Sequence, residues 1–267
     1  MRKNLRLTIV LVTALCVTIL LTPFQLIGLA GVPWLSRHVP VLYHKIIAWL
    51  FGVRITLDGA LCPNRPLMIV ANHVSWLDIV ILSSIAPLSF VAKAEMATWP
   101  LFGQLAWMQR TIFVKRQERR RSAEQANQIA ERLGERDTMV LFPEGTTSDG
   151  HAMLPFKTTL FEAARLALAD AHEEHAVIQP VAIDYTRLHG LPLARQFRQH
   201  VAWPGDVGLG EHFLPLVATG ALDVIVHLGE PIAFTAQSNR KVVAAQCQDA
   251  IRRMLHGAAL DSAQADR

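Results

Sequence analysis

The sequence is poor in the residues that organise disulfide frameworks, metal centres and nucleic-acid surfaces. Its three cysteines, in a chain of 267 residues, are widely scattered and form no Cys-x-x-Cys pair. This spacing argues against a disulfide framework and a cysteine-based metal site, and it favours a reducing compartment. The chain has only two tyrosines and no interleaving of basic and aromatic residues. We therefore expect neither a metal nor a nucleic-acid partner.

Charged residues are also sparse. They make up 18% of the chain and hydrophobic residues 51%, against typical values of about 25% and about 45–50%. This shift favours contact with a membrane, but it is too small for a protein that crosses the bilayer many times. The net charge of +4 suits an anionic membrane surface or an anionic substrate. The length fits one α/β domain of about 200 residues with an appendage.

The longest uncharged stretch runs from Leu7 to Ser36, behind three basic residues. A cleaved signal peptide fits it poorly, because the apolar stretch is long and no Ala-x-Ala site follows. A single membrane span is long enough, but the positive-inside rule would then place the rest of the chain outside the cell. A membrane hairpin is the third interpretation. It keeps the basic residues at both ends of the stretch on one side of the bilayer.

We favour the hairpin for residues 1–52 and keep the single span as the alternative. Leu7–Leu21 would form a helix of about 22 Å, shorter than the hydrocarbon core of about 30 Å. The prolines and glycines from Pro23 to Pro33 are expected to end it. A second apolar helix is expected at Val39–Phe51, with basic residues nearby that can reach lipid headgroups.

Beyond residue 52, short apolar runs alternate with helical patterns. This alternation predicts an α/β domain with a largely parallel sheet flanked by helices, which we place at residues 53–256. The clearest helical patterns are Arg120–Leu133 and Thr158–His172. Residues 257–267 are small and polar and are expected to form a flexible tail. The candidate strands are Leu67–Ala71, Ser89–Ala92, Thr111–Val114, Thr138–Phe142, Val177–Ile183 and Leu222–His227.

The candidate catalytic residues are His73 and Asp78, which follow the apolar run Leu67–Ala71. A carboxylate can fix the imidazole tautomer and leave the second ring nitrogen free to take a proton. Five residues correspond to about 500° on a helix, so the pair needs His73 in a loop and Asp78 in the first turn after it. Active sites of open parallel sheets lie at such strand ends.

The His-x4-Asp spacing alone is a weak signal, because short motifs often arise by chance. A second copy, at His256 and Asp261, follows no strand and is interpreted as accidental. A structural alternative also exists for the first copy. The segment Ser75–Asp78 can be a helix-capping box in which Asp78 turns back to the backbone rather than to His73.

Two further segments carry candidate substrate-binding residues. Phe142–Ser148 combines a proline, a carboxylate, a glycine and three hydroxyls, which suit a polar or anionic headgroup but also an ordinary turn. Phe113–Arg116 places a guanidinium at a strand end, where it can bind a phosphate or carboxylate. The candidate substrate-binding residues are Arg116, Glu144, Gly145, Thr146, Thr147 and Lys157.

Taken in order, these segments resemble the glycerolipid acyltransferase family of bacterial 1-acylglycerol-3-phosphate acyltransferases. The motifs lie between Leu67 and Tyr185: Asn72–Asp78 is similar to the family's first motif, Phe113–Arg116 to its second, Phe142–Thr146 to its third and Val177–Ile183 to its fourth. The resemblance implies an enzyme that acylates the free hydroxyl of a lysolipid at the cytoplasmic face of the inner membrane. It implies acyl-CoA or acyl carrier protein as the donor, and no cofactor.

In the mechanism that the resemblance implies, His73 deprotonates the lysolipid hydroxyl as that oxygen attacks the acyl thioester, and Asp78 holds the imidazole. Arg116 and Glu144 would position the acceptor, and backbone amides would stabilise the oxyanion. The sequence departs from the family at Thr147, which replaces an arginine expected to hold the acceptor phosphate. Threonine there resembles the lyso-ornithine lipid and lysophospholipid acyltransferase branches, so we expect activity on an acceptor of lower headgroup charge to rival or exceed activity on 1-acylglycerol-3-phosphate. Arg116 and Lys157 can still supply positive charge, so both acceptors stay open.

Three rival classes are weaker. A hydrolase using Ser75 or Ser148 as its nucleophile would lack the Gly-x-Ser-x-Gly elbow. A metal held by His172 and His175 would lie at a charged helix end, which is more typical of solvated surface. A catalytically silent lipid-binding protein would tolerate His73→Ala, whereas the enzyme would not.

Overall fold

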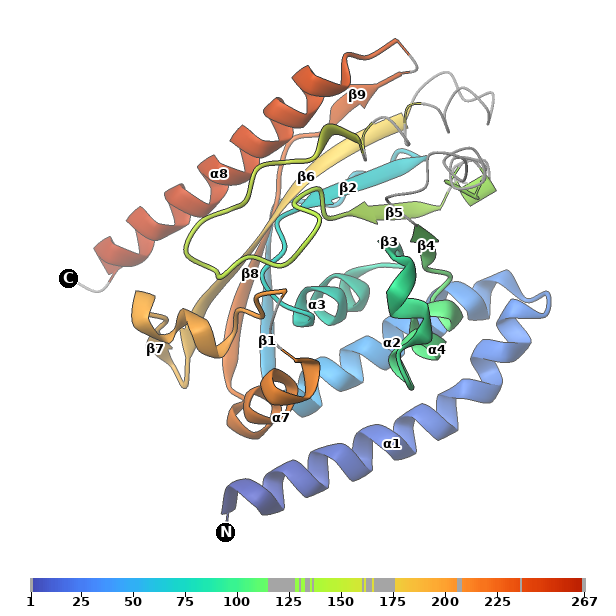
Figure 1. Cartoon of the computed structure of the whole chain (residues 1–267), viewed down its shortest axis with the longest axis vertical. Helices are drawn as coiled ribbons and strands as arrows, with labels where there is room; N and C mark the ends of the chain where they lie inside the picture. The colour runs from blue at the N-terminus through green and yellow to red at the C-terminus, as the bar shows by residue number, and fades with distance from the viewer. Residues whose placement is uncertain are drawn as a thin grey trace.

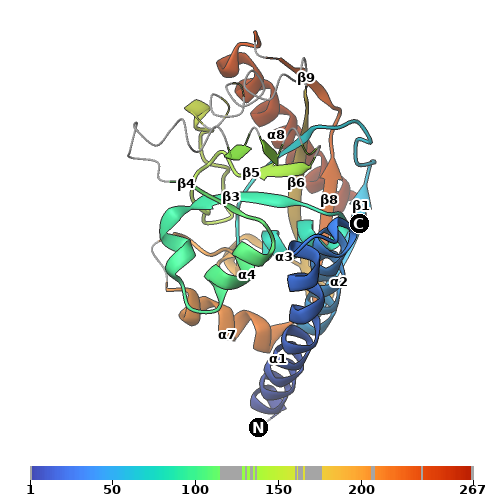
Figure 2. The same cartoon turned by 90° about the vertical axis from the view of Figure 1, so that its right-hand side faces the viewer.

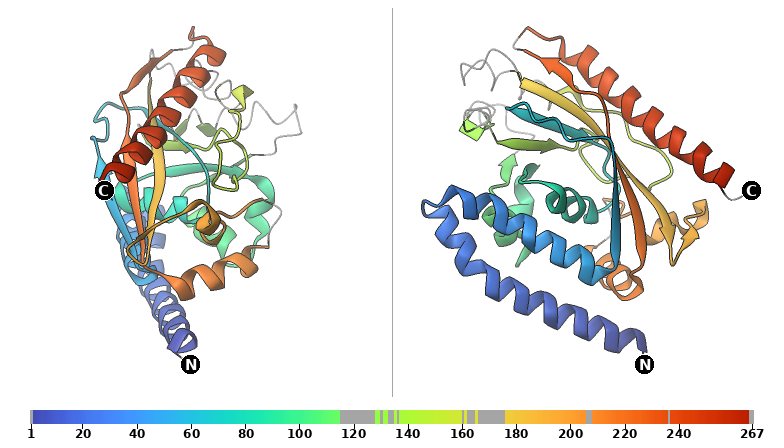
Figure 3. Two further views of the ribbon diagram at one scale, coloured as in Figure 1. Left: turned by 90° about the vertical axis from the view of Figure 1, so that its left-hand side faces the viewer. Right: turned by 180° about the vertical axis from the view of Figure 1, so that it is seen from behind.

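Two long helices open the chain. The computed structural model describes residues 2–114, 128–129, 131–132, 135, 137–159, 161, 165, 176–205, 208–235 and 237–265. Helices α1 (Arg2–Leu29) and α2 (Pro33–Phe51) lie side by side and are joined by a short turn (Figures 1 and 3). They form the pair of N-terminal helices that the sequence predicts, which we call the α1–α2 hairpin.

The first helix is longer than the sequence predicts. It continues through Pro23 and Gly28, and its segment Asn4–Leu29, of 26 residues, is long and apolar enough to cross a membrane. At 1.5 Å per residue this segment spans about 39 Å, so the prediction of a short, interrupted helix is wrong. Pro23 removes only one helical hydrogen bond, and packing against α2 offsets that loss. Gly28 permits close helix contact, because a Cβ there would lie 2.4 Å from Ser36 N.

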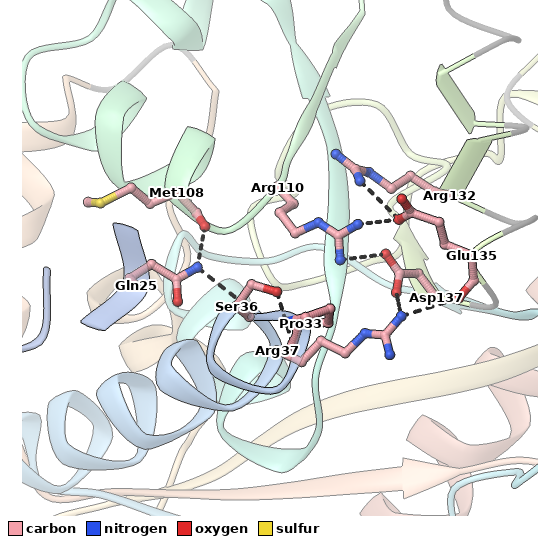
Figure 4. A network of polar contacts seen from close by, with 9 residues as sticks. All are labelled: Gln25, Pro33, Ser36, Arg37, Met108, Arg110, Arg132, Glu135 and Asp137. Atoms are coloured by element: carbon pink, nitrogen blue, oxygen red, sulfur yellow. Dashed lines mark hydrogen bonds and ion pairs between the residues drawn. The ribbon is translucent and has the colours of Figure 1, made fainter. Parts of the chain in front are cut away.

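Polar contacts fix the turn end of the hairpin to the rest of the molecule (Figure 4). Gln25 Nε2 donates to the carbonyl of Met108 at 2.6 Å. Arg37 Nη2 lies 3.0 Å from Asp137 Oδ1, and Arg110 Nη1 lies 3.0 Å from Asp137 Oδ2. The buried carboxylate of Asp137 therefore binds two arginines, Arg37 of α2 and Arg110, and so connects α2 to the rest of the molecule.

The opposite end of α1 is fixed as well. Arg6 donates to the backbone carbonyl of Val217 and, at 3.4 Å, to that of Phe51. Both ends of α1 thus contact the α/β domain.

A mostly parallel sheet lies at the centre of the described residues. Its strands are β1 (Val53–Asp58), β2 (Leu67–Ala71), β3 (Ser89–Lys93), β4 (Ile112–Val114), β5 (Thr138–Leu141), β6 (Ala176–Leu188), β7 (Leu191–Pro192), β8 (Leu222–Leu228) and β9 (Ile232–Phe234). The strand order is β1-β8-β6-β2-β5-β3-β4, and β7 and β9 also pair with β6. Strand β2 pairs in parallel with β5 and β6, β3 with β4 and β5, and β1 with β8. The antiparallel pairs join β6 to β7, β8 and β9.

Helices cover both faces of this sheet. After α1 and α2, the helices of the described residues are α3 (Leu77–Ile85), α4 (Phe102–Met108), α7 (Leu209–Thr219) and α8 (Arg240–Ala265), with the 3₁₀ helices η1 (Ala94–Thr98) and η3 (Arg195–His200). Helix α8 lies on one face, and α2, α3 and α7 lie on the other (Figures 1 and 2). Along β2, Leu67, Ile69 and Ala71 belong to the core shared with α3, whereas Met68 and Val70 belong to the core shared with α8. Burial on both faces explains the continuous apolar run of this strand.

The predicted α/β fold with a largely parallel sheet is confirmed. Strand β2 has the predicted bounds, and the other five predicted strands overlap β3, β4, β5, β6 and β8. The edge strand β1 and the short strands β7 and β9 were missed, because exposed or very short strands leave little apolar pattern. Helix α8 continues past His256 to Ala265, so regular structure does not end where the tail is predicted. The predicted helices Arg120–Leu133 and Thr158–His172 lie largely outside the described residues.

Candidate active site

His73 and Asp78 meet just beyond the end of β2. Strand β2 ends at Ala71, the loop carries His73, and α3 begins at Leu77, so Asp78 lies in the first helical turn. His73 Nδ1 lies 2.8 Å from Asp78 Oδ2. The side chain of Asp78 is 0% exposed and that of His73 is 15% exposed. The arrangement of loop and first turn that the spacing requires is therefore present.

Asp78 also binds the backbone that precedes it. Its Oδ2 accepts the N–H of Val74 at 2.7 Å and the N–H of Ser75 at 3.0 Å. Asp78 thus turns back to the backbone and contacts His73 at the same time, so the two interpretations do not exclude each other. These donors, at the N-terminal end of α3, compensate the buried negative charge.

An aromatic contact fixes the plane of the imidazole. The ring of His73 stacks on that of Phe142, with centroids 4.0 Å apart and planes at 14°. Phe142 directly follows β5, the parallel neighbour of β2. The two strands end at the same edge of the sheet, so their loops meet there.

The buried side chain of Glu144 connects the loop after β2 to the loop after β5. It is 1% exposed. Its Oε1 accepts the backbone N–H of His73 and its Oε2 accepts that of Leu154, both at 2.7 Å. Burial raises the pKa of Glu144 to about 7, although these two hydrogen bonds act in the opposite direction. A further bond, from Ser148 N–H to the carbonyl of His73 at 2.8 Å, joins the same two loops.

Thr147 is buried too, at 7% exposure. Its hydroxyl donates to the carbonyl of Trp203. The N–H of Trp203 in turn donates to the carbonyl of Val74 at 2.8 Å. The segment around Trp203 therefore bridges the loop after β5 and the loop that carries His73.

Comparison with known proteins decides the family. A family model described as acyltransferase matches residues 53–184. The chain is 44% identical over 257 residues to the lyso-ornithine lipid O-acyltransferase of Brucella abortus (strain 2308), a match that covers 96% of each chain. The chain belongs to the acyltransferase family. The resemblance that the four sequence motifs carry is confirmed. All four motifs lie inside the matched residues 53–184.

A further relative agrees with this membership, and a solved structure agrees with the fold. The chain is 38% identical over 120 residues to a 1-acyl-sn-glycerol-3-phosphate acyltransferase of Neisseria meningitidis serogroup B, covering 42% of this chain and 47% of the relative. The crystal structure of the 1-acyl-sn-glycerophosphate acyltransferase PlsC from Thermotoga maritima superposes with a TM-score of 0.67 at 21% identity. That match covers 97% of this chain and 98% of the other, and it supports the fold.

The other predicted site residues of this acyltransferase are only partly brought together in the structure. Gly145 has a φ of 78° and forms a turn in which its N–H donates to the carbonyl of Phe142 at 3.0 Å. Thr146 is half-buried in the same loop, and the Lys157 side chain is exposed. The loop after β5 thus brings Glu144 to Thr147 beside His73. Arg116 lies outside the described residues.

The structure disfavours the serine nucleophiles of the hydrolase alternative and the second His-x4-Asp copy as active-site residues of this acyltransferase. Ser75 and Ser148 are both buried. His256 and Asp261 lie on the single helix α8, where a separation of five residues turns them about 500° around the axis. Their spacing therefore lacks the loop-and-turn geometry of the first copy. His172 and His175 lie outside the described residues.

Sequence reasoning missed two contributors to the site of this acyltransferase. The hydroxyl of Tyr185 donates to Asp78 Oδ1 at 2.6 Å. Asn72 exchanges two hydrogen bonds with the backbone of Ile183, at 3.0 and 2.8 Å. Ile183 and Tyr185 both lie on β6. The alternation of side chains along a strand could have indicated that these two side chains share a face. No local pattern indicates which loop that face meets.

Proposed function

We propose that His73 is the general base of an O-acyltransferase that moves a fatty acyl group from a thioester to the free hydroxyl of a lysolipid. The observation that carries this role is the 2.8 Å contact between His73 Nδ1 and the buried Asp78 Oδ2. When the carboxylate holds the Nδ1 proton, Nε2 has a lone pair that can accept a proton.

In the proposed reaction the acceptor oxygen attacks the thioester carbonyl as its proton passes to His73 Nε2. A C–O bond forms, and the carbonyl becomes a tetrahedral oxyanion that nearby backbone amides can stabilise. Asp78 stabilises the imidazolium. Collapse of the intermediate breaks the C–S bond, and the imidazolium returns its proton to the leaving thiolate. The products are the ester and the free thiol of CoA or acyl carrier protein.

Lyso-ornithine lipid is the acceptor that we propose. The relatives from Brucella abortus and, at 43% identity over 243 residues, Rhizobium meliloti (strain 1021) are both named lyso-ornithine lipid O-acyltransferases. Thr147 supports this choice, because its buried hydroxyl binds a backbone carbonyl and offers no charge to a phosphate. The open surface beside the same loop carries polar side chains that could meet a headgroup, those of His151, Arg195, Gln196 and Gln199.

We further propose that the α1–α2 hairpin enters one leaflet of the inner membrane and leaves the α/β domain on the cytoplasmic side, where acyl thioesters are made. Arg6 and Gln25 tie opposite ends of α1 to that domain. A helix that crossed the bilayer could not keep both contacts, so the hairpin is favoured over a single span. The tryptophans Trp34 and Trp49 suit the membrane interface. Exposed apolar residues of α1 include Ile9, Val12, Leu15, Ile19, Leu20, Phe24 and Ile27.

One assay tests the proposed reaction against its rivals. Purified protein is given labelled acyl-CoA or acyl carrier protein with lyso-ornithine lipid, lysophosphatidic acid or other lysophospholipids. We expect label in a new ester of the lysolipid and an equal amount of free thiol. Release of label as free fatty acid would indicate a hydrolase. Lipid binding with no transfer from either donor would indicate a silent lipid-binding protein.

A further inference from the structure

Tyr185 contacts the carboxylate oxygen of Asp78 that His73 leaves unused. Its hydroxyl donates to Oδ1 at 2.6 Å, whereas His73 binds Oδ2. Both side chains are buried, with Tyr185 4% exposed. We infer that Tyr185 is a positioning residue for acyl transfer, which acts on His73 through Asp78. This inference rests on the proposed function of His73 and Asp78.

The backbone of β6 is shaped to deliver this hydroxyl. The antiparallel register between β6 and β8 shifts between Tyr185 and Arg187. Such bulges often lie beside active sites, where they re-aim a side chain. Two residues earlier, Ile183 is fixed by its paired hydrogen bonds to Asn72, the residue that precedes His73. Strand β6 is therefore joined to this site at alternate residues, to the loop of His73 through the backbone of Ile183 and to the first turn of α3 through the side chain of Tyr185.

The contact with Tyr185 orients the carboxylate as well as stabilising it. Oδ2 of Asp78 accepts from His73, Val74 and Ser75. Among the described hydrogen bonds, Tyr185 supplies the one to Oδ1. Without this donor, a buried charged oxygen would lose its partner and the carboxylate could rotate away from the imidazole.

The hydroxyl remains a donor at neutral pH. Burial raises the pKa of Tyr185 well above its usual value of 10.0, and the charge of Asp78 and the hydrogen bond to it act in the same direction. The phenol therefore stays protonated at neutral pH.

The chain offers a matched control, because it has only two tyrosines. The other is Tyr43 in α2, whose hydroxyl lies 3.2 Å from Thr18 Oγ1. We expect Tyr185→Phe to lower kcat about tenfold or more, the usual worth of a hydrogen bond to a charged group, and to change each KM less than twofold. Tyr43→Phe should change kcat and KM less than twofold.

A pH profile separates positioning from packing. If the carboxylate turns away from the imidazole in Tyr185→Phe, the imidazolium loses stabilisation, so the acidic limb of kcat/KM should move to lower pH. A kcat within twofold of wild type, or a lower kcat with an unmoved acidic limb, would overturn the inference. Activity of His73→Ala is measured in parallel. If that variant remains active, the proposed function fails; if it is inactive while Tyr185→Phe is unaffected, only the positioning role fails.

Discussion

Oε1 of Glu144 accepts the backbone N–H of His73 at 2.7 Å, and Oε2 of the same carboxylate accepts the N–H of Leu154 at an equal distance. Both oxygens are therefore engaged within the protein, and the side chain is 1% exposed. This geometry favours a role in holding the loop of His73 over direct contact with the acceptor. The third motif thereby supports the first, because β2 and β5 are parallel neighbours that end at one edge of the sheet.

The first prediction concerns the catalytic pair. His73→Ala should lower kcat by about 10²–10⁴-fold, the usual contribution of a general base, and leave the fold intact. Asp78→Asn should also lower kcat strongly, because it removes the charge that stabilises the imidazolium. His256→Ala is the matched control, since it alters the second His-x4-Asp copy, and it should leave kcat unchanged. Steady-state kinetics and circular dichroism measure both properties. Equal losses from His73→Ala and His256→Ala would contradict the assignment.

The second prediction concerns stability and pH at Glu144. Burial raises the pKa of Glu144 from 4.5 to about 7, so the folded protein binds this proton more tightly than the unfolded chain does. The stability gained from that proton is complete below a pH of about 4.5 and is lost as the pH rises through about 7. Glu144→Gln cannot titrate and lacks this dependence.

Thermal midpoints of the two proteins test this difference. Between a pH of about 5.5 and about 8, the midpoint of the wild type should fall relative to that of Glu144→Gln. A gap between the two midpoints that stays constant over this range would show that Glu144 does not bind its proton more tightly in the folded state.

The contact between His73 and Asp78 and the core of the sheet could be predicted from the sequence because their signals are local. Leu67–Ala71 is a five-residue apolar strand, and its bounds are matched in the structure. His73 and Asp78 are five residues apart, so only one loop and one helical turn decide whether they meet. The order of these and the remaining motifs then carried the resemblance to the family, which the comparisons confirm.

The contacts that hold the site together could not be predicted, because they join residues far apart in the sequence. Tyr185 reaches Asp78 over 107 positions, and Trp203 reaches Thr147 over 56. Such contacts depend on strand order and on the bulge in β6, which no short pattern encodes. The break predicted at Pro23 failed for a related reason, since packing of α1 against α2 outweighs the local preference of proline.

The third prediction concerns the topology of the hairpin. Asn4 and Val32 lie near opposite ends of α1, and both are exposed. In a Cys16→Ala background, Asn4→Cys and Val32→Cys should react with a membrane-impermeant maleimide from the same, cytoplasmic side, because Arg6 and Gln25 fix both ends of α1 to the α/β domain. Inside-out and right-side-out vesicles distinguish the two sides. Labelling of the two cysteines from opposite sides would demonstrate a single span instead.

The native Cys16 provides an internal control for depth. It is exposed on the protein surface and lies near the middle of α1, whereas Cys62 and Cys247 are buried. In the wild type, a water-soluble maleimide should fail to modify Cys16 in either vesicle orientation, because the hairpin holds it in the hydrocarbon layer. A membrane-permeant maleimide should modify it. Rapid modification by the water-soluble reagent in intact vesicles would place α1 outside the leaflet.

The last prediction concerns Thr147 and the acceptor. Thr147→Val keeps the shape of the side chain but removes the hydroxyl that binds the carbonyl of Trp203. Loss of this bond should loosen the bridge to the catalytic loop and lower kcat/KM about three- to tenfold for lyso-ornithine lipid and lysophosphatidic acid alike. The ratio between the two acceptors should stay constant, so this variant isolates the structural role of the hydroxyl.

Thr147→Arg combines that structural loss with a new positive charge. Because the native side chain is 7% exposed, the longer arginine must displace the segment around Trp203 to reach an acceptor, so both activities should fall. A charge-assisted contact with the phosphate that restores about 1.4 kcal/mol would nevertheless shift preference towards lysophosphatidic acid about tenfold relative to Thr147→Val. The measurement is kcat/KM for both acceptors in the wild type and the two variants. If the wild type strongly prefers lysophosphatidic acid and Thr147→Arg leaves the ratio unchanged, the threonine does not select the acceptor. Headgroup choice would then have to come from other residues around the site.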